Sequence, residues 1–176
     1  VGDFYMVCSN SKYGLYSKKG VIVIPCEYST IEFKDVAEKK MIEVKKGLKV
    51  GLYETTGILV FPAEKYESYS HEGTYYQVTG DGGMVGICDV YGNELVPCRY
   101  AKLDYNKRIH AFIGSRGSLK GIVSMRGREL FPFVNTRVLE LNPIRPDILV
   151  VSNGESNGFG AIDYAGHLVV PMKNKY

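Results

Sequence analysis

With 176 residues and 45% hydrophobic content, the chain is long enough to bury a core as one domain or one repeat array. Its formal net charge of +3 is mild and does not by itself require a nucleic-acid partner. No stretch approaches the roughly 18 consecutive apolar residues of a membrane-spanning helix, so we expect no membrane contact. The 14 tyrosines and 20 glycines, with no tryptophan, favour strands joined by turns.

In chain order, the first recognisable element is a phrase of thirteen residues that occurs five times, at residues 13–25, 50–62, 85–97, 120–132 and 159–171. Each copy contains a glycine, a second glycine six residues later, and a proline eleven residues after the first glycine. These structural positions are Gly14, Gly51, Gly86, Gly121 and Gly160, then Gly20, Gly57, Gly92, Gly127 and Gly166, then Pro25, Pro62, Pro97, Pro132 and Pro171. A fixed register over steps of 35 to 39 residues indicates a tandem repeat.

Each part of the phrase predicts a local structure. The second glycine closes a turn at positive φ, and the apolar residues three and four positions after it predict a strand that is buried on both faces. Because proline cannot donate a ladder hydrogen bond, we expect it to end this strand. The first glycine lies inside a strand, where it predicts a bulge or the close approach of a neighbouring backbone.

Two more strands are predicted between one proline and the next phrase. The first follows the proline at residues 28–33, 66–70, 100–105 and 136–141, and the second precedes a phrase at residues 4–8, 41–45, 75–79, 110–114 and 148–152. Each unit is thus a meander of four short strands in about 35 residues. No segment shows a sustained helical period, so we expect almost no helix.

These units predict a single all-β repeat domain over residues 1–176. A four-stranded unit cannot bury its faces alone, and stacking of successive units solves this problem. Two arrangements do so, a propeller-like ring and an open β superhelix or solenoid. The sequence narrowly favours the ring.

The phrase resembles the WG-repeat family of bacterial proteins, also called KWG repeats. The family consensus runs lysine, tryptophan, glycine, an apolar pair, a short turn, glycine, an apolar run, isoleucine–proline and a tyrosine, and it matches well at Lys12–Tyr28 and Lys49–Tyr66. The tryptophan position instead holds Tyr13, Val50, Val85, Lys120 and Phe159. The resemblance implies an all-β bacterial repeat with no assigned catalytic role, used as an interaction or scaffold module.

Residues that carry catalytic or metal chemistry are scattered. The cysteines Cys8, Cys26, Cys88 and Cys98 form no C-x-x-C pair, and Cys26 and Cys98 directly follow the repeat proline, which predicts unpaired, packed thiols. The histidines His71, His110 and His167 show no metal-ligand spacing. We therefore expect no catalytic residue, no metal and no cofactor, and a protein that is not an enzyme. Unpaired thiols and the lack of a visible signal peptide slightly favour the cytoplasm.

Positive charge is concentrated in one part of the chain. Residues 1–88 carry 10 basic and 11 acidic residues, a net charge of −1, whereas residues 89–176 carry 12 and 8, a net charge of +4. The candidate anion-binding residues are Arg99, Tyr100, Lys102, Tyr105, Lys107, Arg108, Arg116, Arg126 and Arg128. Basic side chains interleaved with aromatic ones can hold nucleic acid. Strand alternation equally predicts that these charges are scattered over solvated faces.

The sequence favours a non-catalytic module that binds protein partners, because function in repeat arrays of this kind lies on surfaces and loops. One alternative is binding of nucleic acid or another polyanion through the basic third and fourth units. Another is binding of carbohydrate by tyrosines at the rim.

Overall fold

The computed structural model describes residues 4–134, 137–139, 148–152, 158–163 and 165–173. In these residues the secondary structure consists of strands and one three-residue 3-10 turn, η1 (Asp81–Gly83), so the predicted all-β class is confirmed. The strands are β1 (Phe4–Ser9), β2 (Lys12–Ser17), β3 (Ile22–Tyr28), β4 (Thr30–Val36), β5 (Lys39–Lys46), β6 (Lys49–Glu54), β7 (Leu59–Tyr66), β8 (Ser68–Glu72), β9 (Tyr75–Thr79), β10 (Val85–Asp89), β11 (Glu94–Tyr100), β12 (Lys102–Asn106), β13 (Ala111–Arg116), β14 (Leu119–Ser124), β15 (Glu129–Val134), β16 (Arg137–Leu139), β17 (Ile148–Ser152), β18 (Phe159–Asp163) and β19 (Leu168–Lys173).

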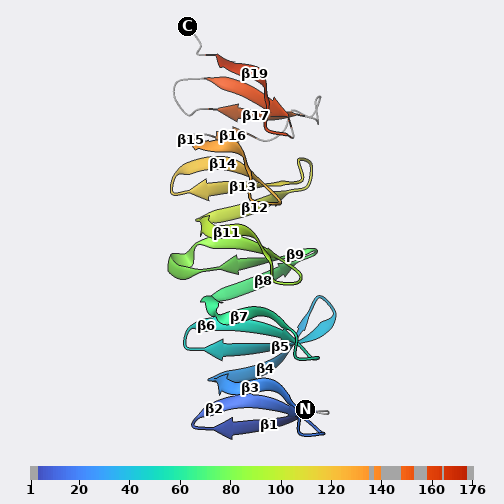
Figure 1. Cartoon of the computed structure of the whole chain (residues 1–176). Coiled ribbons are helices and arrows are strands. Elements are labelled where there is room, and N and C mark those ends of the chain that lie inside the picture. Colours follow the sequence, from blue (N-terminus) through green and yellow to red (C-terminus); the bar gives the residue numbers. More distant parts are fainter. Residues whose placement is uncertain (1–3, 135–136, 140–147, 153–157, 164, 174–176) are drawn as a thin grey trace. The chain divides into compact units, whose positions relative to one another are not determined.

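The strands form five small sheets, each an up-and-down meander of consecutive strands (Figure 1). The first sheet has the order β1-β2-β3, and the others run β4 to β7, β8 to β11, β12 to β15 and β16 to β19. This matches the predicted five copies of the last three strands and four copies of the first. Of the strand predicted at residues 136–141, β16 is the described part, and the rest lies outside the described residues. By their internal contacts the residues fall into two compact units, a first unit of residues 1–83 and 87–94 and a second unit of residues 84–86 and 95–176.

The first glycine of each phrase lies at an interruption of the ladder between the last two strands of its sheet. In the first sheet Tyr13 pairs with Tyr28 and Leu15 pairs with Ile24, so Gly14 lies opposite a bulge of β3. The same shift occurs at the equivalent glycines of β6, β14 and β18. A Cβ atom on Gly14 would lie only 2.6 Å from the Cys26 Sγ atom. Both features predicted for this glycine, a bulge and a close approach, are present.

The repeat proline does not end the strand, and this prediction was wrong. Pro25 lies inside β3, and the other four prolines lie inside β7, β11, β15 and β19. The reason is the bulge, because the proline is among the extra residues that stand out of the ladder register opposite the first glycine. On a bulged edge strand the missing N–H group breaks no ladder hydrogen bond, so the strand continues past the proline.

The second glycine of each phrase has positive φ, as predicted, with values of 77° to 89°. This glycine also touches the sheet before its own. A Cβ atom at Gly57 would lie 2.9 Å from the carbonyl oxygen of Val23, and one at Gly127 would lie 2.6 Å from that of Leu95. At Gly92 and Gly166 an added Cβ would overlap the carbonyls of Val60 and Leu130. Only glycine fits where the turn of one repeat meets the last strand of the repeat before it.

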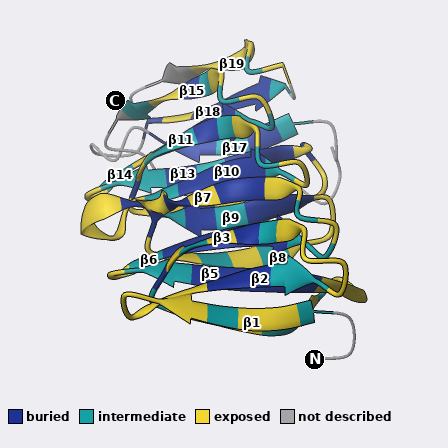
Figure 2. Ribbon diagram, turned by 60° about the horizontal axis from the view of Figure 1, so that its bottom comes forward, coloured by how far each residue is buried: buried dark blue, intermediate teal, exposed yellow. Residues whose placement is uncertain are grey.

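Apolar side chains fill the space between successive sheets within each unit, where Figure 2 shows the buried segments. In the first unit, Leu15 and Ile24 of the first sheet form one cluster with Ile42 and Val44 of the second sheet. In the second unit, Phe131 of β15 packs in one cluster with Leu149 of β17. The repeats therefore bury their faces against one another, as the sequence predicted.

The first and last sheets break this burial pattern. The fourth residue after the second glycine is at most 7% exposed in Ile24, Phe61, Val96 and Phe131, whereas Val170 in the last sheet is 47% exposed. The residues that pair with the first glycines are Val7, Val44, Gly114 and Val151. The residues two positions before these are, in the same order, Tyr5, Ile42, Phe112 and Leu149. Tyr5 is 61% exposed, while the other three are at most 1% exposed. Burial on both faces of the last strand thus fails at Val169–Val170 because no following sheet covers them in the part of the chain that the structure describes.

We expect Gly127→Ala to destabilise the protein more than Gly20→Ala. Both glycines have φ of 77°, so both substitutions incur about 1–2 kcal/mol for a left-handed alanine. Only at Gly127 would the new Cβ meet a carbonyl, because no atom lies within 4 Å of a Cβ built on Gly20. The steric conflict should add about 1–3 kcal/mol. Equal losses of unfolding free energy in urea for the two variants would contradict the proposed role of the turn glycine.

Candidate functional site

The centre of the predicted basic site is a tyrosine held between two arginines in the second unit. Tyr100, at the end of β11, is fully buried. Its hydroxyl accepts hydrogen bonds of 3.2 Å from the Arg99 Nε atom and from the Arg116 guanidinium. The guanidinium carbon of Arg116 lies 4.8 Å from the centroid of the Tyr100 ring and 4.3 Å from that of Phe133. Because the Tyr100 ring is covered in this way, it cannot stack on a nucleic-acid base.

A carboxylate that directly follows the basic segment forms ion pairs with both of these arginines. Glu129 of β15 forms an ion pair of 3.3 Å with Arg99 and a second ion pair with Arg116. Partial burial alone would lower the pKa of Arg116, but hydrogen bonds to Glu129 and Tyr100 outweigh it and raise the pKa above its ordinary value. The two arginines are therefore committed to a contact inside the protein, and this weakens them as ligands for an external anion.

The same arrangement occurs one repeat earlier, in the first unit. Lys65 lies over the ring of Tyr66, 5.2 Å from its centroid, and forms an ion pair of 2.7 Å with Glu94. In both copies a basic residue precedes the buried tyrosine and pairs with the glutamate two residues after the next turn glycine. The pairs join one repeat to the next, which gives these residues a structural role.

The other predicted basic residues lie at two opposite ends of the sheet β12 to β15. Lys102 pairs with Asp104 at 2.7 Å and lines a shallow hollow of about 100 Å³ at the Arg116 end. Lys107 and Arg108 lie in the turn after β12, and Arg126 and Arg128 in the turn after β14. Both turns lie at the other end, because Ala111 pairs with Asn106 and with Ser124. The six residues of β13 separate the two ends by roughly 17 Å, so the nine candidates do not form one patch.

Tyr105, the second aromatic candidate, belongs to the end with the two basic turns. Its hydroxyl lies 3.2 Å from the Nδ1 atom of His110, and its ring centroid lies 5.5 Å from that of Phe112. Tyr105 is half-buried. Its neighbours at this end are Lys107, Arg108, Arg126 and Arg128, so this end holds the part of the predicted site that faces solvent.

The cysteines and histidines form no site of their own in the described part of the chain. No disulfide joins any of the four cysteines, and burial raises the pKa of the Cys88 thiol, which lies 3.1 Å from the Tyr66 hydroxyl. Among the described residues no group of three or more His, Cys, Asp or Glu side chains could hold a metal ion. The same residues contain no helix long and apolar enough to cross a membrane.

The first unit carries an exposed apolar surface that sequence reasoning missed. We call it the apolar strip, and it consists of Val21, Ile22, Ile58, Leu59, Val90 and Tyr91, each 38% to 76% exposed. These residues lie in or beside the turns that lead into the last strand of the first three repeats. The turns are neighbours in space, because Gly57 meets the backbone of Val23 and Gly92 meets that of Val60. Exposed apolar side chains gathered on neighbouring turns are typical of interaction sites.

A hollow of about 180 Å³ lies next to the apolar strip and shares Val90 with it. Lys39, Glu54, His71 and Tyr76 are among the residues that line it. Burial, and then the nearby charge of Glu54, raises the pKa of Tyr76, so this hydroxyl is a hydrogen-bond donor at neutral pH. The ring of His71 lies 5.1 Å from that of Tyr76 in an edge-on arrangement. The hollow thus offers polar groups of both signs beside an apolar surface.

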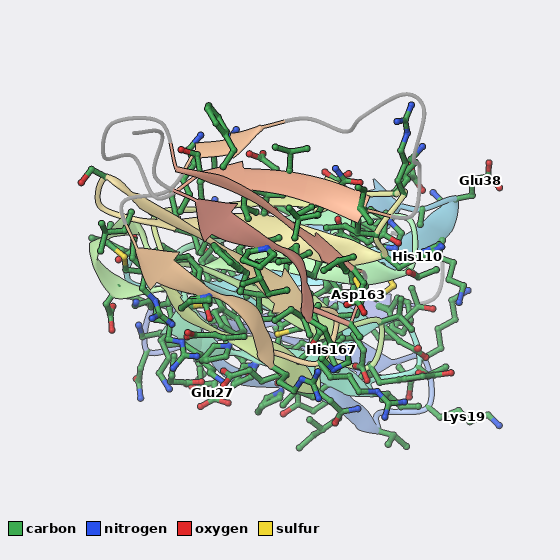
Figure 3. All side chains as sticks on the ribbon, turned by 90° about the horizontal axis from the view of Figure 1, so that it is seen from above. Lys19, Glu27, Glu38, His110, Asp163 and His167 are labelled. Carbon is green, nitrogen blue, oxygen red and sulfur yellow. The ribbon has the colours of Figure 1, made fainter. Side chains whose placement is uncertain are left out.

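An aspartate holds the turn that carries Tyr91. The carboxylate of Asp89 accepts hydrogen bonds from the backbone N–H groups of Tyr91 and Asn93 and from the Asn93 side chain. Asp163 makes the equivalent turn in the fifth repeat, where its Oδ2 atom lies 3.0 Å from the Nδ1 atom of His167 (Figure 3). Both aspartates therefore have a structural role in their turns.

Comparisons with known proteins give no family for this chain. No family model matches it, and no curated protein matches it. Among solved structures, the computationally designed Ika8 protein is 10% identical with a TM-score of 0.36, and the match covers 99% of this chain and 60% of that protein. The AfRom2 CNH domain is 12% identical with a TM-score of 0.30, covering 98% of this chain and 68% of that domain. A protein of unknown function from Bacteroides caccae is 14% identical with a TM-score of 0.31, covering 90% and 67%.

We expect Asp89→Asn to lower stability in a pH-dependent way. Partial burial alone would raise the pKa of Asp89, but the hydrogen bonds that its carboxylate accepts outweigh it and lower the pKa. The ionised carboxylate therefore stabilises the fold fully above its unfolded pKa of about 3.9, and this contribution is lost as pH falls through the lower, folded-state pKa. The variant should lose about 1 kcal/mol at neutral pH. In urea titrations the difference from wild type should narrow below pH 4; a difference independent of pH would contradict this role.

Proposed function

We propose that the protein is a non-catalytic, WG-repeat-like interaction module that binds a protein partner through the apolar strip of its first unit. The exposure of this strip carries the proposal. Six apolar side chains from three successive repeats lie in and beside neighbouring turns, where they face solvent. Surfaces of this kind in a folded chain favour association with another protein, because association removes apolar area from water.

The backbone beneath the strip supports this function. The turn glycines press against the carbonyls of the preceding repeat, so Ile58 and Tyr91 stand on turns with little room to move. Asp89 fixes the turn of Tyr91 further by accepting two backbone hydrogen bonds. A surface that is ordered before binding loses less conformational entropy when the partner arrives. The adjoining hollow adds polar groups that can select among partners.

For the arrangement of the five sheets, the proposal keeps the propeller-like ring that the sequence narrowly favoured, with the open array as the alternative. Small-angle X-ray scattering separates the two forms, because an open array has the larger radius of gyration.

We expect a photo-crosslinking amino acid at Leu59 to capture a discrete protein partner in cells. The same group at Leu48 should not do so, and this is the matched control because Leu48 is 89% exposed but lies outside the strip. After the partner is identified by mass spectrometry, calorimetry should show that Ile58→Glu weakens binding at least about tenfold, since it places a charge in an apolar contact. The same adducts at both positions, or an unchanged affinity in Ile58→Glu, would contradict the proposal.

Polyanion binding is a second candidate, favoured only by the four basic residues in the two turns near Tyr105. If these four neutralise phosphates, affinity for a single-stranded oligonucleotide should fall roughly 50-fold between about 50 and 200 mM salt. Arg108→Gln should reduce the salt slope by about 0.7, whereas Arg99→Gln should leave it unchanged because Arg99 is already paired with Glu129. Fluorescence anisotropy measures both. Tight binding that persists at physiological salt would overturn the protein-binding proposal in favour of a nucleic-acid function.

A further inference from the structure

Glu54 departs from the other repeats at the residue that begins the turn before the last strand of each sheet. In the other four repeats this side chain accepts backbone N–H groups of its own turn, and the residues are Ser17, Asp89, Ser124 and Asp163. Among the described residues, the half-buried Glu54 carboxylate instead accepts one hydrogen bond, of 3.3 Å, from the Thr56 hydroxyl, and it forms no ion pair. Its negative charge is therefore available to a ligand.

Tyr76 departs from the other repeats where the second and third sheets meet. Its ring centroid lies 5.6 Å from that of Phe61, at a place where the equivalent clusters hold the apolar residues Ile42 and Leu149. Tyr76 is only 4% exposed, yet its hydroxyl has no hydrogen-bond partner within the described part of the chain. Because a buried hydroxyl without a partner is unfavourable, such a group in a native structure points to a binding role.

Both departures meet in the hollow of about 180 Å³, which Glu54 and Tyr76 line together. Burial, and then the charge of Glu54, raises the pKa of the Tyr76 hydroxyl, so this hydroxyl is neutral and lies near the carboxylate. Val36, Met41 and Val90 are the apolar side chains of the lining. At about 30 Å³ for each water molecule, the hollow holds roughly six non-hydrogen atoms, which is the size of one long side chain.

The charges around the hollow favour a cation. An anionic group in the hollow would lie against the half-buried carboxylate of Glu54. Lys39, which has the opposite charge, is exposed, so its long side chain can extend into solvent. Three further acidic residues directly adjoin lining residues in the sequence, and these are Glu38, Glu72 and Asp89. A basic side chain therefore suits this hollow better than an acidic one.

The second unit of the chain shows which basic side chain suits a tyrosine together with a glutamate. Arg116 donates a hydrogen bond to the Tyr100 hydroxyl and forms an ion pair with Glu129. A guanidinium presents several N–H donors in one plane, so it can serve a carboxylate and a hydroxyl at the same time, whereas an ammonium is a compact point charge. Arginine is also enriched in protein–protein interfaces.

We propose that the hollow binds an arginine side chain of the protein partner. The guanidinium donates hydrogen bonds to the Glu54 carboxylate and to the Tyr76 hydroxyl, and the methylene groups pack against Met41 and Val90. This inference rests on the proposed function, because the hollow shares Val90 with the apolar strip and one partner surface can contact both.

The test uses Nα-acetyl-arginine methylamide as the probe and the full chain as the protein. NMR titration should show saturable shifts of signals from residues that line the hollow, with a Kd in the millimolar range expected of so small a ligand. The citrulline analogue has the same shape but no charge, and it should bind at least about tenfold more weakly. Equal or tighter binding of the citrulline analogue, or of the glutamate analogue, would overturn the proposal.

Two variants separate binding from folding. Tyr76→Phe removes only the unpartnered hydroxyl, and Glu54→Ser introduces the side chain that caps the equivalent turn at Ser17, so both should melt at or above the wild-type temperature. Both should weaken binding of the arginine probe at least about fivefold. Tyr91→Phe is the matched control and should leave binding unchanged, since Tyr91 is in the strip but does not line the hollow. Unchanged binding in Tyr76→Phe, or a loss of stability in that variant, would overturn the site.

The outcome also separates the hollow from the apolar strip. If the arginine probe does not bind while the crosslinker at Leu59 captures a partner, the arginine site is overturned and the strip remains supported. If the probe binds in the hollow while the crosslinker captures nothing, the strip is overturned and the hollow remains supported as a guanidinium site.

Discussion

The contact between a turn glycine and the carbonyl of the preceding repeat is the constraint on which the other features depend. It sets how closely two sheets approach, and with that distance fixed, residues such as Ile24 and Ile42 reach each other and exclude water. A side chain at Gly127 would hold the turn away from Leu95 and open a gap between two packed sheets. The strict spacing of glycine in the sequence is thus a packing requirement as well as a turn requirement.

Most of the fold could be predicted from the sequence because the repeat gives up to five residues at each equivalent position. Five apolar entries at the position of Ile24 identify a core residue more securely than any one of them could. The position of Pro25 inside a continuing strand could not be predicted in this way. A proline in a strand normally marks its end, and only the register of β2 against β3 shows that a bulge accommodates it. The exposure of Tyr5 and Val170 could not be predicted either. The repeat pattern describes an internal unit, and these two residues lie in the first and last sheets.

The candidate site was harder to predict because charge along the chain is a poor guide to charge in space. The basic segment ends at Arg128, and the next residue, Glu129, pairs with two of its arginines, Arg99 of β11 and Arg116 of β13. Comparison of the repeats could have indicated these ion pairs. Lys65 and Arg99 each directly precede the repeat tyrosine, and Glu94 and Glu129 each lie two residues after a turn glycine. The apolar strip was missed for a different reason. Val21 and Ile58 extend the apolar run of a core strand, and only the observed burial separates the exposed start of that run from its buried centre.

The prolines inside the last strands have a consequence for how sheets of this kind avoid aggregation. Strands β3, β7, β11, β15 and β19 each form an outer edge of their sheet, and each carries one repeat proline. An edge strand that is bulged and lacks one backbone donor is a poor template for the addition of another chain's strand. Backbone pairing of the kind that builds amyloid is thereby discouraged at five sheet edges.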